Sequence, residues 1–195
     1  FGIQHLPEKQ NLSQKKKIIL SNRLHKPLYR IDKIISAFAH LINSQLIDSD
    51  FKLIVTASGE ESPALQAQAK ELGIYDKVEF TGMLGYEQLV EYYKVAKVFV
   101  SVPISDGTAS SLLESMAYGC IPVLSNLPAN LEWVLDKING FIVPNVGDLG
   151  QQILSAIKLS SNYDGYQKLY NFNHQVISNK ATFQNNIKAF IELYQ

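Results

Sequence analysis

Two apolar patterns alternate regularly along the chain, and this alternation constrains the fold more than any other feature. Short apolar runs, typical of buried strands, are separated by segments in which apolar residues recur every three or four positions, as on one face of a helix. We expect strands at 17–22, 51–57, 78–81, 98–102, 121–124 and 140–143. We expect helices at 31–42, 64–72, 87–95 and 109–118, and a further helix with Pro128 in its first turn that leads into 131–135. This order predicts an α/β fold, a doubly wound parallel sheet with helices on both faces.

The two ends of the chain differ from this central pattern. From residue 147 onward the spacing is helical only, with a break expected at 160–166 and closing helices over 165–195. The last apolar stripe consists of Phe183, Ile187, Phe190, Ile191 and Tyr194. Residues 1–16 are predicted to be a lead-in, because Phe1-Gly2-Ile3 reads as the middle of a longer protein. Since no linker divides the chain, 1–195 is predicted to be a single domain.

Composition excludes several classes of protein. The 18 basic residues (Lys and Arg) balance the 18 acidic ones (Asp and Glu), so no strong field favours nucleic acid or an anionic membrane. The single cysteine, Cys120, excludes a disulfide framework, favours a reducing, cytoplasmic setting, and is expected to be a small buried hydrophobe. No apolar run is long enough to span a bilayer. The basic stretch Lys15-Lys16-Lys17 is expected to be a solvated strand edge.

One loop has the composition of a ligand site. Ligands of open α/β sheets bind at the carboxyl ends of the strands, and the loop after the strand at 98–102 contains only small residues at 107–110, directly before a helix. Unpaired backbone N–H groups and the helix dipole could hold a phosphate there. An ordinary helix start with Ser105 or Asp106 as the N-cap explains the same residues equally well.

The same loop and helix carry a specific resemblance. Residues 106–123 read DGTASSLLESMAYGCIPV. This stretch resembles the signature of retaining GT-B glycosyltransferases of the family 4 type, in which an acid and a Glu are separated by seven residues and Gly-x-x-Pro-Val follows. Asp106 and Glu114 take the two acidic positions. Three flanking stretches are similar to the same family: 21–24, 71–82 and 92–96. The resemblance runs to about residue 160 and implies the Rossmann-like half of a GT-B fold.

The resemblance implies a role for each matching residue. Glu114 would accept hydrogen bonds from the ribose hydroxyls, and Asp106 would lie near the hydroxyls of the donor hexose. Arg23 would pair with diphosphate oxygens, which its planar guanidinium suits. The nucleobase would lie against loops near Gly59 and Val78. Backbone N–H groups that would hold the diphosphate belong to Gly107, Thr108, Ala109 and Ser110.

The chain departs from the family pattern near the diphosphate. Asp106 is one methylene shorter than the usual glutamate, and the lysine expected a few residues after Arg23 is not clearly present. Lys26 or Arg30 would supply the second positive charge, although a surface position explains either residue as well. His25 could reach a phosphate, but we expect it to be a solvated loop histidine. The aromatic residues Tyr92, Tyr93 and Trp133 are expected to pack rather than to bind a sugar.

The sequence therefore predicts the donor-binding domain of a retaining glycosyltransferase. It would bind a UDP-, GDP- or ADP-sugar without a metal or other cofactor, while a missing N-terminal half would bind an acceptor glycan or lipid-linked sugar. Alone, this domain would transfer little, and the intact protein would be cytoplasmic or peripheral at the inner face of the membrane. One alternative is a domain of a sugar-nucleotide epimerase with GT-B architecture. Another is a non-catalytic, flavodoxin-like module, although Ser21-Asn22-Arg23 stands where a phospho-receiver needs acids.

Overall fold

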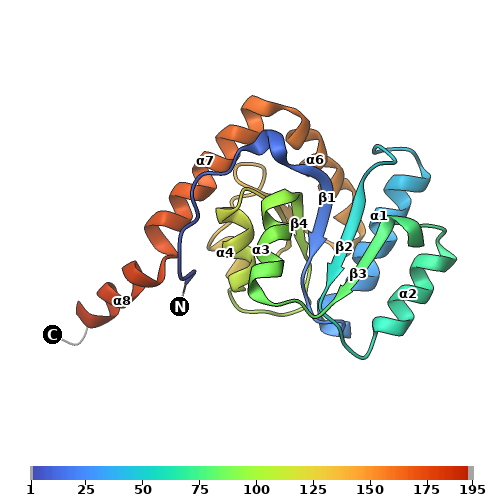
Figure 1. The fold of residues 1–195 in the computed structure, drawn as a ribbon, viewed down its shortest axis with the longest axis horizontal. Coiled ribbons are helices and arrows are strands. Elements are labelled where there is room, and N and C mark those ends of the chain that lie inside the picture. The colour runs from blue at the N-terminus through green and yellow to red at the C-terminus, as the bar shows by residue number, and fades with distance from the viewer. Residues whose placement is uncertain (1, 193–195) are drawn as a thin grey trace.

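The computed structural model describes residues 2–192 and has the doubly wound α/β fold that the sequence predicts (Figure 1). Phe1, Tyr194 and the side chain of Phe190, which belong to the predicted lead-in and closing stripe, lie outside the described residues. Within these residues one six-stranded parallel sheet has the order β3-β2-β1-β4-β5-β6. Its strands are β1 (Lys16–Ser21), β2 (Lys52–Thr56), β3 (Val78–Gly82), β4 (Ala96–Ser101), β5 (Ile121–Ser125) and β6 (Phe141–Val143).

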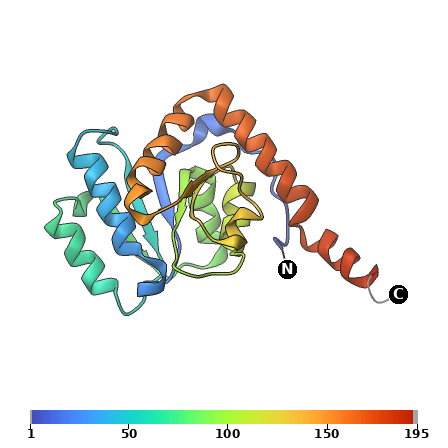
Figure 2. The ribbon, with the colours of Figure 1, turned by 180° about the vertical axis from the view of Figure 1, so that it is seen from behind.

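Both faces of the sheet are buried. Successive side chains of a strand point to opposite faces, so Ile19 of β1 joins one apolar core and Leu20 joins the other. Helices α1 (Ile31–Asn43), α2 (Ser62–Glu71) and α6 (Leu149–Ser161) cover the Ile19 face. Helices α3 (Tyr86–Val95), α4 (Ser110–Ala117) and α5 (Pro128–Leu131) lie on the Leu20 side (Figures 1 and 2). Short 3₁₀ helices occur at Leu12–Gln14, Pro27–Tyr29, Tyr75–Lys77 and Val146–Asp148.

The ends of two helices test the sequence prediction. Helix α4 ends before Gly119 as expected; this glycine has a φ of +82°, and the next N–H bonds back to Ser115. The helix expected after Pro128 begins at Pro128 as predicted, but its extension over 131–135 is wrong, since α5 already ends at Leu131. The side chain of Asn139 instead bonds to the Leu135 N–H (2.7 Å) and the Trp133 carbonyl (2.9 Å), which folds this segment into a turn.

Within the described residues, α6 and two further helices follow the last strand of the sheet. The predicted break at 160–166 is reduced to Asn162, whose side chain accepts a hydrogen bond from the Gly165 N–H (3.0 Å) and starts α7 (Tyr163–Lys180). Helix α8 (Phe183–Glu192) comes next. The N-terminal segment runs beside α7 and bonds at Ile3 to Ala181 (2.8 Å) and Phe183 (2.9 Å) (Figure 1). None of the described helices is both long enough and apolar enough to cross a membrane.

Lys15 corrects the prediction of a solvated basic edge. Its side chain is buried, at 6% exposure, and its Nζ donates to the carbonyls of Tyr93 and Tyr118, each at 2.7 Å. Cys120, buried as predicted, places its Sγ 3.8 Å from the same nitrogen. The two carbonyls lie at the C-terminal ends of α3 and α4, where the helix dipole favours a cation. Burial lowers the pKa of Lys15.

Candidate active site

The strand order reverses between β1 and β4, and the loops that follow these two strands meet. Arg23, just after β1, forms an ion pair with Asp106 from the loop after β4; their side chains are 13% and 24% exposed. The guanidinium carbon of Arg23 also lies 4.5 Å from the ring centroid of Tyr29. A backbone bond from the Ile104 N–H to the Leu28 carbonyl (2.9 Å) joins the same two loops. Two of the predicted site residues are therefore in direct contact.

The loop after β4 leads into the N-terminus of α4. The N-cap residue is Ala109, which has no side-chain acceptor, so the alternative in which Ser105 or Asp106 caps this helix is wrong. Within the described part of the chain, no group accepts a hydrogen bond from the backbone N–H of Gly107, Thr108, Ala109 or Ser110. These N–H groups are available to an anion.

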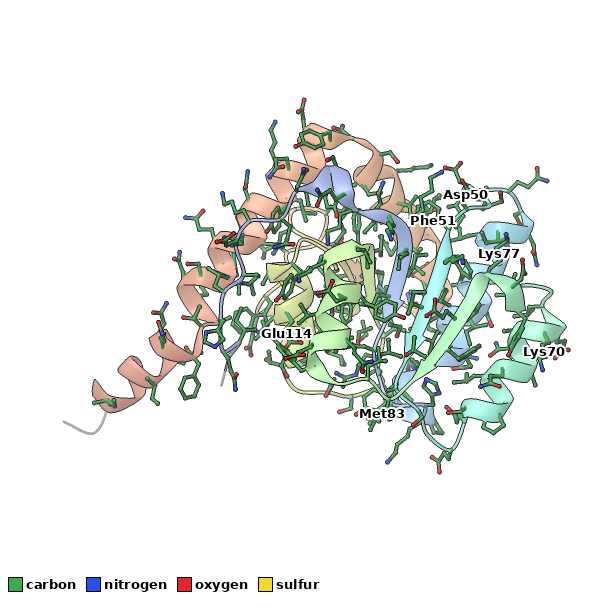
Figure 3. All side chains as sticks on the ribbon, viewed as in Figure 1. Asp50, Phe51, Lys70, Lys77, Met83 and Glu114 are labelled. Atoms are coloured by element: carbon green, nitrogen blue, oxygen red, sulfur yellow. The ribbon has the colours of Figure 1, made fainter. Side chains whose placement is uncertain are left out.

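Glu114 lies one turn into α4 and is half-buried (Figure 3). Burial raises the pKa of its carboxyl group, and the Tyr93 hydroxyl opposes that rise. The Asn22 side-chain nitrogen donates to the same hydroxyl (2.7 Å). Glu114 also borders a hollow of about 430 Å³, which is lined by Gly2, Ile3, Gln4, Tyr86, Ser110 and Glu114.

His25 is not the solvated loop histidine that the sequence predicts. It is 2% exposed, with Nδ1 2.7 Å from the Ser62 hydroxyl and Nε2 3.2 Å from the Thr56 carbonyl. Because a carbonyl can only accept, Nε2 carries a hydrogen and donates to Thr56. Burial lowers the pKa of His25, against the hydrogen bond to Thr56. A side chain at Gly59 would come within 2.4 Å of the His25 carbonyl, so glycine lets the β1 and β2 loops close together.

Val78 does not lie with the other predicted site residues. It begins β3, where it pairs with Leu53, and is therefore at the amino end of the strand. The carboxyl end is Gly82, followed by Met83, which is 67% exposed. Figure 3 shows Met83 and Lys77, the neighbour of Val78, at opposite ends of β3. The loop after Gly82, rather than Val78, therefore lies at the same edge of the sheet as Arg23 and Gly59. The sequence could have indicated this loop, because it directly follows the predicted strand at 78–81.

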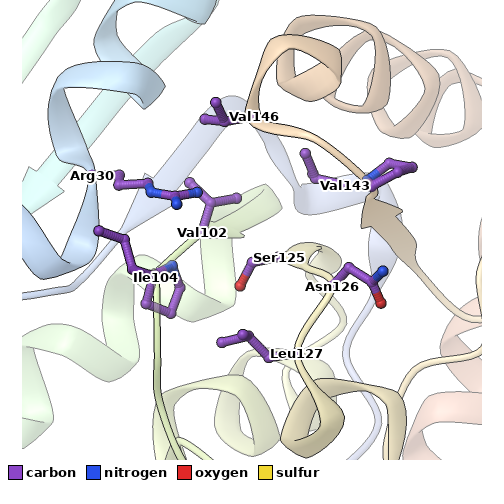
Figure 4. Close-up of a pocket in the computed structure, with 10 residues that line it drawn as sticks. Arg30, Val102, Ile104, Ser125, Asn126, Leu127, Val143 and Val146 are labelled. Carbon is purple, nitrogen blue, oxygen red and sulfur yellow. The ribbon is translucent and has the colours of Figure 1, made fainter.

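The two candidates for a second positive charge differ in position. Lys26 is exposed and precedes the 3₁₀ helix Pro27–Tyr29. Arg30, with a φ of 52°, points into a hollow of about 200 Å³ at the carboxyl ends of β4, β5 and β6, opposite Ser125 and Asn126 (Figure 4). Of the two, Arg30 is the one that faces a cavity at this edge of the sheet.

Sequence reasoning missed the hydroxyl of Tyr93. The residue is fully buried, which confirms the predicted packing, but its hydroxyl group also accepts a hydrogen bond from the Asn22 side chain beside the site (2.7 Å). A tyrosine in an apolar helix face carries no sequence signal that separates these two uses. Among the described residues, no group of three His, Cys, Asp or Glu side chains could hold a metal ion.

Comparison with known proteins identifies the family to which this chain belongs. Residues 3–175 match the family model described as glycosyl transferases group 1, which is most of the chain. The chain belongs to the group 1 glycosyl transferases. Family membership favours an enzyme over the non-catalytic module that the sequence left open.

Relatives and solved structures agree with this assignment. An alpha-monoglucosyldiacylglycerol synthase of Streptococcus pneumoniae is 28% identical over 172 residues, covering 87% of this chain and 38% of the relative. TarM of S. aureus superimposes with a TM-score of 0.82 over the whole chain at 17% identity. The pneumococcal O-GlcNAc transferase GtfA gives 0.80 over 98% of the chain, also at 17% identity. The two structures show that this glycosyl transferase chain has the predicted Rossmann-like GT-B fold. The chain spans about 38% of the length of each of these proteins.

Proposed function

We propose that this chain is the donor-binding domain of a retaining, family 4 type glycosyltransferase that uses a nucleoside-diphosphate sugar. One observation carries the proposal: Arg23, Asp106 and Glu114 lie around the N-terminus of α4 at the point where the strand order reverses. A cation, a set of available N–H groups and a carboxylate at this place suit a diphosphate joined to a ribose.

Each group then has a distinct task. Arg23 and the N–H groups of 107–110 neutralise the departing diphosphate, where negative charge develops as the bond to the anomeric carbon breaks. Glu114 accepts hydrogen bonds from the ribose hydroxyls, and Asp106 faces the transferred hexose. Arg30 supplies the second charge from its hollow beside β4. The bond between the anomeric carbon and the diphosphate breaks, the acceptor oxygen bonds to that carbon on the same face, and its proton passes to an oxygen of the departing diphosphate.

The relatives suggest which molecules take part. GtfA was solved with UDP and GlcNAc, and TarM with UDP, so UDP is the first donor nucleotide to test. The synthase of S. pneumoniae is named for a glucosyl lipid, which makes a lipid-linked sugar a candidate acceptor. We place acceptor binding in an N-terminal domain outside this chain, so the chain alone transfers little sugar. The intact enzyme would work in the cytoplasm or at the inner membrane face, without a cofactor.

Calorimetric titration of the chain with UDP, GDP and ADP tests the proposal. One nucleotide should bind, and both Glu114→Ala and Arg23→Ala should weaken it by about tenfold or more, since each removes a charge-assisted contact. Glu87→Ala and Lys33→Ala are matched controls, because both side chains are exposed and lie outside the site. Wild-type affinity in both site variants would overturn the site, as would the absence of binding by all three nucleotides.

A further inference from the structure

We propose that the amino edge of the sheet carries a second ligand site, a hollow that takes a small amphiphilic anion: a phosphate or carboxylate group joined to a short alkyl chain. The hollow has a volume of about 250 Å³ and lies at the start of strands β1, β2 and β4. The candidate active site lies at the opposite ends of these strands. Figure 3 shows Phe51, which lines the hollow, at the other end of the sheet from Met83.

One wall of the hollow is apolar. Ile47 and Phe51 belong to the connection between α1 and β2, and α6 contributes two further apolar side chains, Leu154 and Ile157. All four are between 3% and 9% exposed and belong to the core on the Ile19 face. Leu46 lines the same hollow and is 48% exposed, so apolar surface is open to a ligand there. An alkyl chain bound against this wall would be removed from water.

Three ammonium groups surround the apolar wall. Lys17 and Lys97 each occupy the second position of a strand, in β1 and β4, and Lys158 lies in the last turn of α6. Lys17 is already paired, with its Nζ 2.7 Å from Asp48 and 3.5 Å from Asp50. Among the described residues, no carboxylate lies within 4.0 Å of the ammonium group of Lys97 or Lys158. These two positive charges are available to an anion.

Lys97 is the group that gains most from a bound anion. Its side chain is half-buried, and burial together with the nearby charge of Lys17 lowers its pKa, against the opposing effect of Asp48. Burial and a like charge both disfavour an ammonium ion, and a negative group beside Lys97 would offset both. The hollow thus places unpaired positive charge next to open apolar surface, and an amphiphilic anion matches both features.

The volume of the hollow limits the size of the ligand. Pockets for drug-sized molecules usually have about 300–1,000 Å³, so this hollow suits something smaller. Hexyl phosphate, which has a phosphate group and six carbon atoms, is a suitable probe. Calorimetric titration should show that it binds in the millimolar range or more tightly. Inorganic phosphate lacks the alkyl chain and hexylammonium has the opposite charge, so each should bind about tenfold more weakly or not at all.

Variants of the lysines test where the probe binds. Lys97→Met removes the charge, keeps an unbranched apolar side chain, and should weaken hexyl phosphate binding about tenfold. Lys158→Gln, at an exposed position, should also weaken it and keeps the test decisive if Lys97→Met does not fold. Lys52→Met is the matched control, because Lys52 is exposed at the start of β2 but does not line the hollow. Wild-type affinity in both site variants, or equal binding of hexylammonium, would overturn the proposal.

The second site has to be separated from the candidate active site and from a membrane. Arg23→Ala should leave the affinity for hexyl phosphate unchanged, and UDP should not displace the probe, since Arg23 lies at the opposite edge of the sheet. Loss of the probe in either experiment would place it at the active site and overturn this inference. Vesicles that contain phosphatidic acid present the same head group with its chains held in a bilayer. They should not compete with hexyl phosphate, and competition would overturn a free ligand. A chain that binds hexyl phosphate but no nucleotide would contradict the proposed function and leave this site intact.

Discussion

Glu114 is held where its ionised form is costly. Burial raises the pKa of its carboxyl group in the folded chain above the value of an unfolded glutamate. Between these two pKa values the folded chain binds more protons than the unfolded chain, so the free energy of unfolding falls as pH rises through this window. A residue that lowers stability at neutral pH is typical of a functional site rather than of a structural ion pair.

Glu114→Gln should therefore stabilise the chain at neutral pH. The amide keeps the shape of the carboxyl group without its charge, and we expect the melting temperature to rise by about 2 °C. The gain should vanish in mild acid, where Glu114 is protonated in both states. Thermal unfolding across this pH range measures it, with the exposed Glu87→Gln as the control. A melting temperature that falls at neutral pH would contradict this account of Glu114.

Asp106 forms an ion pair with Arg23, so a diphosphate has to compete with it for the guanidinium. Asp106→Asn keeps the size of the side chain and releases the guanidinium. UDP, which lacks the hexose, should then bind about threefold more tightly, and its affinity should depend more steeply on salt. Calorimetry at two salt concentrations measures both effects. The control Asp32→Asn breaks an exposed ion pair with Lys33 and should change neither the affinity for UDP nor its salt dependence. Weaker UDP binding by Asp106→Asn would contradict competition between Asp106 and the diphosphate.

At the scale of elements, Lys15 connects the lead-in to two helices at once. Its ammonium group lies between the last carbonyls of α3 and α4, the helices that carry Tyr93 and Glu114. The Tyr93 carbonyl also accepts a hydrogen bond from Cys120. Among the described residues, the side chain that donates to the Tyr118 carbonyl is Lys15. The relative position of α3 and α4 thus depends on a residue outside both.

Lys15→Met should lower the free energy of unfolding by about 2 kcal/mol, because the half-buried Tyr118 carbonyl loses its donor and the Tyr93 carbonyl loses one of two. The destabilisation is no larger because Lys15→Met also removes the free-energy cost of burying an ammonium group. Urea unfolding gives the value. Lys16→Met is the matched control, since the neighbouring side chain is exposed. Equal stability of the two variants would show that the contacts of Lys15 with α3 and α4 contribute nothing.

The strands could be predicted from sequence because each is a local apolar run, and the acidic positions Asp106 and Glu114 because the motif that carries them is contiguous. The burial of His25 and Lys15 could not be predicted from the sequence, since their hydrogen-bond partners Ser62 and Tyr118 come from distant segments. Val78 lies at the amino end of β3, whereas the rule that ligands bind at the carboxyl ends of strands favours the loop after Gly82.

On the scale of the whole molecule, the sheet separates two apolar cores. Phe38 of α1 belongs to the core on the Ile19 face, whereas Trp133 belongs to the core on the Leu20 face. Helix α7 contributes to both, with Tyr170 in the first and Ile177 in the second. The shared sheet and the shared helix imply that neither face can unfold while the other stays folded.

Trp133 is the single tryptophan of the chain, so its fluorescence reports on one core alone. Phe38→Ala leaves a cavity in the opposite core and should cost about 3–5 kcal/mol. If the sheet couples the two faces, the urea midpoint of Trp133 fluorescence falls as far as the midpoint of far-ultraviolet circular dichroism. Leu46→Ala, at an exposed apolar position, should move neither midpoint appreciably. A fluorescence midpoint that stays at the wild-type value while the dichroism midpoint falls would mean that the two cores unfold separately.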